Sequence, residues 1–149
     1  MTNSLYLVLA ALLVGAMIPF QLAFNAQLGV AMKSPYTAGL VIFVVGALAM
    51  LIMIAVMKQP LPAANAIVNA PSTAWLGGVL ASFYILAVVI VTPKLGVGTT
   101  VVLVISGQIL FALVLEHFGA FGSMQHTFSW SRALGAVLVI AGVFAIRAH

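Results

Sequence analysis

Apolar residues fill five long stretches of this chain, and short polar or proline-bearing segments separate them. Four stretches are close to the ~20 residues that an α-helix needs to cross a ~30 Å hydrocarbon core. The first is longer, and Pro19 in its middle predicts a kink or a tilt that absorbs the surplus. No stretch sustains a period of two, so the prediction is all-helical. The five predicted spans are residues 5–32, 37–57, 73–92, 97–118 and 130–146.

The composition agrees with a membrane location. Hydrophobic residues make up 65% of the 149 residues and charged residues only 4%, whereas soluble domains carry roughly 25% charged residues. We therefore expect one all-α transmembrane domain over residues 1–149, with the lipid bilayer as its main partner. Basic residues occur singly, so no nucleic-acid partner is expected. The chain has no cysteine and one acid, and its sequence shows no metal-ligand spacing. We accordingly expect no metal, no cofactor and no enzymatic activity.

The basic residues are divided almost equally between the two membrane faces. With five spans, Lys33, Lys94 and Arg147 share one face, and Lys58 and Arg132 share the other. Because an excess of Lys and Arg on cytoplasmic loops sets orientation, this balance predicts that the chain inserts both ways round. The alternative is that the balance is chance in a sample of five charges.

A chain with dual topology can pair with itself in antiparallel fashion. Such a pair reproduces the inverted-topology repeat of many secondary transporters, whose solute site lies near the bilayer midplane. The sequence therefore predicts one half of an inverted-repeat transporter, working as an antiparallel homodimer.

Five short motifs are distributed along nearly the whole chain. In this order they resemble the YdcZ-like bacterial family of the drug/metabolite transporter superfamily. The resemblance implies a five-helix half-transporter in the bacterial inner membrane. The family commonly has Asp where this chain has Glu116, and its substrates are largely undefined. The motifs are G-A-M-I-P-F-Q-L-A-F-N from Gly15 to Asn25, P-K-L-G from Pro93 to Gly96, S-G-Q from Ser106 to Gln108, L-E-H-F-G from Leu115 to Gly119, and R-A-L-G-A-V-L-V-I-A-G from Arg132 to Gly142.

Amide side chains inside the spans are the candidate solute site. Gln21 and Asn25 are four residues apart on one helical face, just after Pro19, and Gln108 follows Ser106 near the middle of the fourth span. We expect Gln21, Asn25, Ser106 and Gln108 to bind a small neutral or zwitterionic solute at midplane. The alternative is hydrogen bonding between helices, a contribution of roughly 0.6–2 kcal/mol.

Glu116, the only acid, lies near the end of the fourth span. The negative end of its own helix dipole disfavours the carboxylate there, so Glu116 needs a partner. His117, His126 and Arg132 are on the same side of the membrane. The group is either an ion pair that anchors the last two spans or a protonatable coupling site with a histidine relay.

Small residues on the last span predict a helix–helix contact. Gly135 and Gly142 are seven residues apart, with Val139 on the same face, and such spacing permits close helix approach. We expect this face to form the dimer contact, and Gly39 and Gly46 on the second span give a weaker alternative.

The function predicted from these features is a small secondary transporter that moves a small solute across the inner membrane. Two alternatives remain open at this point. A dual-topology ion channel would show flux without coupling, and a structural or accessory membrane protein would use its amides only for packing.

Overall fold

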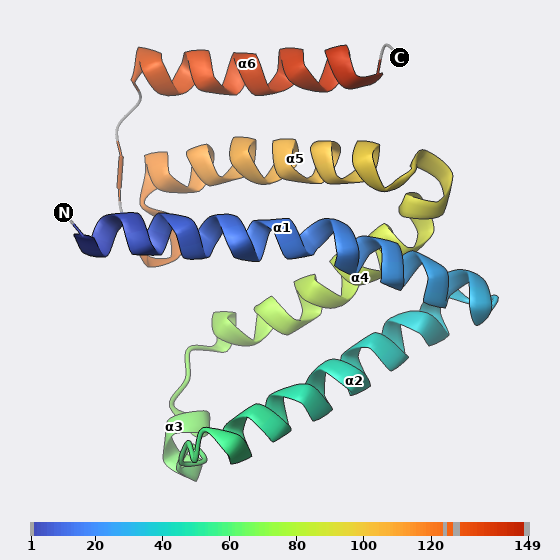
Figure 1. Ribbon diagram of the computed structural model, residues 1–149. Coiled ribbons are helices and arrows are strands. Elements are labelled where there is room, and N and C mark those ends of the chain that lie inside the picture. The colour runs from blue at the N-terminus through green and yellow to red at the C-terminus, as the bar shows by residue number, and fades with distance from the viewer. Residues whose placement is uncertain (1, 124, 127–128, 148–149) are drawn as a thin grey trace. The chain divides into compact units, whose positions relative to one another are not determined.

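The computed structural model describes residues 2–123, 125–126 and 129–147 of the chain. These residues contain helices and no strand, which confirms the all-helical prediction (Figure 1). The helices are α1 (Thr2–Ala31), α2 (Pro35–Val56), α3 (Ala64–Val68), the 3₁₀ turn η1 (Ser72–Trp75), α4 (Leu76–Leu95), α5 (Val97–Phe118), the 3₁₀ turn η2 (Ala120–Gly122) and α6 (Trp130–Arg147).

Local chemistry explains where several helices begin and end. Ser34 caps α2, because its Oγ accepts a hydrogen bond from the Thr37 amide at 3.3 Å, and Pro35 occupies the first turn, where its missing N–H costs nothing. Gly119 ends α5 in the left-handed conformation, with φ +58°. Lys33 and Lys58, with φ +53° and +51°, follow the ends of α1 and α2 in the same conformation.

Neither proline inside a long helix interrupts it. α1 continues through Pro19 without an unwound turn. α4 continues through Pro93 as far as Leu95, three residues beyond the end expected from the sequence. A proline in the last turn removes only one helical hydrogen bond, the one to the carbonyl four residues earlier, so the helix can continue past it.

Four of the described helices are long and apolar enough to cross a membrane: Leu5–Ala31, Pro35–Val56, Ser72–Leu95 and Val97–Phe118. The fifth predicted span is a shorter apolar helix, Trp130–Ala145. The 18 residues of α6 would extend about 27 Å at ~1.5 Å per residue. The described residues therefore contain four candidate spans, and a membrane crossing by α6 remains a prediction.

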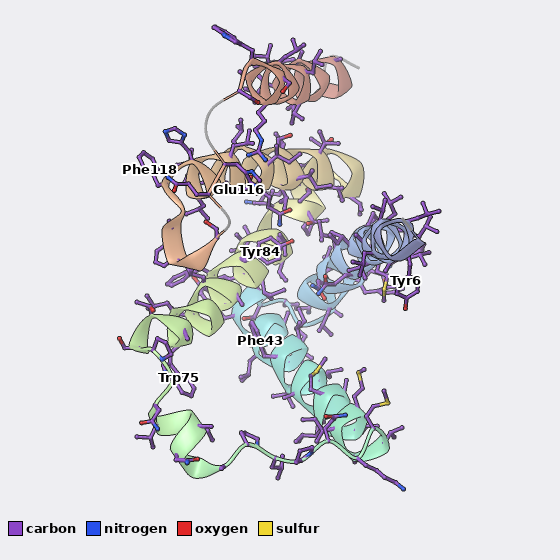
Figure 2. All side chains as sticks on the ribbon, turned by 90° about the vertical axis from the view of Figure 1, so that its left-hand side faces the viewer. Tyr6, Phe43, Trp75, Tyr84, Glu116 and Phe118 are labelled. Atoms are coloured by element: carbon purple, nitrogen blue, oxygen red, sulfur yellow. The ribbon has the colours of Figure 1, made fainter. Side chains whose placement is uncertain are left out.

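The N-terminal unit, residues 1–94, has a small core where α1, α2 and α4 meet. Ala38, Ile85 and Val89 are buried there, with Tyr84 of α4 packed against them. Figure 2 shows Tyr84 on this helix, whereas Tyr6 and Trp75 point away from the unit and are 73% and 60% exposed. In a bilayer, lipid rather than water covers such apolar surface.

The C-terminal unit, residues 95–149, is built on two helices. α5 and α6 lie side by side, and the turn η2 packs against α5 (Figure 1).

Candidate functional site

The two amide side chains on one face of α1, Gln21 and Asn25, differ in exposure. Gln21 is exposed, whereas Asn25 is only 8% exposed. The Nδ2 atom of Asn25 has no hydrogen-bond partner among the described residues. An unsatisfied buried donor costs about 1–3 kcal/mol. Asn25 is therefore a buried donor that a hydrogen-bond partner would stabilise.

Thr92 on α4 is a second buried polar side chain without a partner, and the sequence analysis missed it. It is 2% exposed, and its Oγ1 has no partner among the described residues. Helical hydroxyls usually donate to the carbonyl four residues earlier. Ser82, Thr100 and Ser106 do so here, at 3.0, 2.8 and 2.7 Å. The signal in the sequence was a hydroxyl directly before Pro93, at the end of an otherwise apolar run.

Gly29 brings α1 and α4 into close contact beside these two residues. A Cβ atom at position 29 would lie 2.5 Å from Cγ1 of Val89 and 3.7 Å from its carbonyl oxygen. Pro93 has no N–H, so it cannot donate to that carbonyl. We call Asn25, Gly29, Val89 and Thr92 the α1–α4 seam.

On α5, the two predicted site residues differ in what they contact. Ser106 is 8% exposed, and its hydroxyl donates to the Val102 carbonyl of its own helix. Gln108 is exposed near the middle of α5, and its side chain has no hydrogen-bond partner among the described residues. An amide at this depth must still find a partner, because lipid offers none. Asn25 belongs to the N-terminal unit and Gln108 to the C-terminal unit.

Among the three candidate partners of Glu116, the structure selects Arg132. Nη1 of Arg132 donates to Oε2 of Glu116 at 2.7 Å, and both side chains are about one-third exposed (35% and 36%). The pair joins the end of α5 to the start of α6, where Figure 2 labels Glu116. The Ser129 hydroxyl accepts from the Arg132 amide at 3.3 Å and so fixes the start of α6.

The loop after α5 satisfies the last carbonyls of that helix. The Leu115 carbonyl accepts from the Ser123 hydroxyl at 3.1 Å, and the His117 carbonyl from Nε2 of Gln125 at 3.4 Å. The Glu116 carbonyl accepts from the backbone amide of His126 at 3.0 Å. These groups bond to helix-end carbonyls that water would otherwise have to satisfy. The loop therefore has a structural role at this end of α5.

An apolar hollow of about 400 Å³ lies next to the ion pair, between α5 and α6. Its polar groups are His117, His126 and Arg132, and the His117 ring lies edge-on to the Phe118 ring with centroids 5.0 Å apart. Both histidines are thus near the ion pair, but Glu116 makes its side-chain hydrogen bond to Arg132. The described residues contain no group of three side chains able to hold a metal ion.

The glycines of α6 have no close neighbour within the described chain. A Cβ atom at Gly135 or Gly142 would meet nothing within 4 Å, and Val139 between them is half-buried. On α2, Gly46 is similarly open. Gly39 is buried, and a Cβ atom there would lie 4.0 Å from Cγ2 of Ile85. The small face of α6 is therefore free for a contact outside this chain.

Long apolar helices with a few polar residues at membrane depth define a multi-pass integral membrane protein. Over residues 6–145 the chain matches a family described as "Putative inner membrane exporter, YdcZ". The chain belongs to this family, which confirms the resemblance found in its motifs and the inner-membrane location. No curated protein and no solved structure matches it.

Proposed function

We propose that the chain is a small secondary transporter that exports a small solute, working as an antiparallel homodimer. The observation that carries the proposal is the exposed amide of Gln108. It lies 11 residues after Val97, which is about 16 Å along the helix at ~1.5 Å per residue. That is close to the middle of a ~30 Å hydrocarbon core, where inverted repeats hold their ligands.

The polar groups available inside the membrane-spanning helices indicate the kind of solute. Asn25 offers an unpaired amide nitrogen, and Gln108 offers both an amide nitrogen and a carbonyl oxygen. We assign Asn25 and Gln108 to direct solute contacts, with Gln21 and Ser106 alongside them. Groups of this kind recognise a neutral or zwitterionic solute by hydrogen bonding. Glu116 has a structural role in this proposal, because Arg132 already neutralises it.

Removing the amides without changing side-chain size tests this assignment. We expect Gln108→Leu and Asn25→Leu to abolish solute binding while expression and dimer formation persist, because each replacement removes hydrogen-bonding groups without opening a large cavity. Binding is measured as the rise in Tm of purified protein against a metabolite panel, since a ligand that prefers the folded state stabilises it. Gln59→Leu, in the loop after α2, is the matched control.

Two outcomes would contradict the transporter proposal. Full binding by Gln108→Leu would remove the midplane site. Uncoupled ion flux through vesicles that contain the wild-type chain would favour a channel instead.

The antiparallel pair is tested separately, by topology and by packing. A reporter on the C-terminus should appear on both membrane faces in comparable amounts, because the Lys and Arg bias is nearly nil. Gly142→Leu should weaken self-association about tenfold, or ~1.4 kcal/mol. Ala141→Leu on the adjoining face should have little effect. A single orientation would contradict dual topology, and equal dimerisation of the two variants would place the contact elsewhere, with Gly39 and Gly46 as the next candidates.

A further inference from the structure

We propose that the α1–α4 seam is a hydrated passage that admits neutral and anionic solutes, with Lys94 at its outer end. The inference rests on the proposed transporter function and specifies how a solute reaches the membrane interior. It is carried by two buried polar side chains without partners, Asn25 and Thr92.

Helix geometry places both side chains on the same seam. Asn25 is four residues before Gly29, so the two lie on one face of α1. Thr92 is three residues after Val89, so these two lie on one face of α4. Gly29 and Val89 are in close contact. The Asn25 and Thr92 faces therefore meet where the two helices touch, and the Val89 carbonyl that Pro93 cannot bond lies at this contact.

The polar groups occupy successive depths below one membrane face. Thr92 is three residues before the end of α4, and Asn25 is six residues before the end of α1. At ~1.5 Å per residue these positions are about 5 and 9 Å inside the helix ends. A solute entering at this face would meet Thr92 before Asn25.

Hollows flank the seam on both helices. One, of about 400 Å³, is lined by residues of α1 that include Gln27, together with Pro93. The other, of about 230 Å³, is lined by Gly29, Val89 and Lys94 among others. Both are lined by Val30 and Pro93. Asn25 and Thr92 line neither hollow, but their chain neighbours Ala26 and Pro93 do, so water in these hollows would lie next to the seam.

The charges of the N-terminal unit favour some solutes over others. Residues 1–94 contain no acid, because the only acid of the chain is Glu116. Lys94 is exposed and lines one of the two hollows. From the N-terminal unit a cationic solute would meet a like charge and no carboxylate, so the passage should reject cations.

Because the chain contains no cysteine, single cysteines can report on the seam in the full-length protein. Thr92→Cys and Asn25→Cys are introduced separately, and the protein in membrane vesicles is treated with a methanethiosulfonate reagent. One reagent carries a sulfonate and the other a trimethylammonium group. Each rate is divided by the rate of the same reagent with free mercaptoethanol. Leu22→Cys is the buried apolar control, because Leu22 is 1% exposed on the same helix as Asn25.

We expect Thr92→Cys and Asn25→Cys to react at least about tenfold faster than Leu22→Cys, because a buried thiol in a dry contact reacts only through local opening. The sulfonate reagent should react faster than the trimethylammonium reagent. Adding Lys94→Gln should reduce this preference about sevenfold, because one elementary charge at roughly 7 Å in water changes each rate about threefold, in opposite directions for the two reagents.

Three results would overturn the passage. The first is labelling at Thr92 and Asn25 as slow as at Leu22. The second is a charge preference that Lys94→Gln does not change. The third is a disulfide-linked dimer of the Thr92→Cys variant, which would place a second copy on the seam. Each leaves the Gln108→Leu binding test unaffected, so failure of the passage is distinguishable from failure of the transporter proposal.

Discussion

The buried polar side chains of the two units differ in whether they find a hydrogen-bond partner. In the C-terminal unit, Thr100 and Ser106 bond to carbonyls of their own helix, and Glu116 pairs with Arg132. In the N-terminal unit, Asn25 and Thr92 are more deeply buried than that ion pair and have no partner among the described residues. Both units are built of apolar helices, so composition does not explain the difference.

This difference indicates which buried polar groups are available to a ligand. A satisfied polar group stabilises one arrangement of the helices, whereas an unsatisfied buried group reduces stability until something outside the chain meets it. The ion pair at the end of α5 is therefore best understood as a structural connection. The α1–α4 seam has the properties of a functional surface, because polar residues without partners inside a membrane protein usually mark solute or ion pathways.

A side chain that fills the contact between α1 and α4 should have the largest effect on stability. Gly29→Leu forces a side chain against Val89, whose Cγ1 would lie 2.5 Å from the new Cβ atom. We expect the free energy of unfolding in mixed micelles to fall by about 3 kcal/mol. Val89→Ala should recover part of the loss in the double variant. Gly15→Leu on the same helix is the control, because a Cβ atom there meets nothing within 4 Å. Equal effects at positions 15 and 29 would show that α1 and α4 are not in close contact.

Breaking the ion pair should have a smaller effect. Glu116→Gln or Arg132→Gln should each lower the free energy of unfolding by about 1 kcal/mol, because both groups are one-third exposed and solvent screens them. The double variant should lose less than the sum, with a coupling of similar size. Glu116→Gln should keep some flux. If it is instead stable but insensitive to a proton gradient, the carboxylate is the coupling site and the structural assignment is wrong.

Replacing one buried threonine by valine in each unit should have the smallest effects on stability. Thr100→Val removes a hydrogen bond of 2.8 Å to the Gly96 carbonyl and should cost about 0.5–1 kcal/mol. Thr92→Val removes no bond within the chain, so stability should stay unchanged or rise by up to about 1 kcal/mol. Thermal unfolding of the two variants under one condition makes the comparison. A loss at position 92 as large as at position 100 would mean that Thr92 has a partner within the chain.

Sequence alone determined the class of protein and most helix positions. Long apolar runs require helices in lipid, since only internal hydrogen bonding satisfies the backbone there. The predicted span 97–118 has the same bounds as α5, and the predicted span 37–57 differs from α2 by two residues at its start and by one at its end. The last apolar run was predicted as a fifth span, and the structure has a shorter helix there.

Tertiary structure decided which polar and small residues matter, because this depends on what lies opposite each of them. Gln21 and Asn25 are four residues apart, yet one is exposed and the other buried. Helical spacing gives a shared face but does not locate the neighbouring helix. Gly29 and Gly142 are the same residue type, but a Cβ atom would meet a close neighbour, Val89, at Gly29 and nothing within 4 Å at Gly142. Thr92 and Thr100 are both threonines in apolar runs. In the structure the Thr100 hydroxyl donates to the Gly96 carbonyl, whereas the Thr92 hydroxyl has no partner among the described residues. The contact of Gly29 with Val89 joins residues far apart in the chain, so it exists only once the helices have packed.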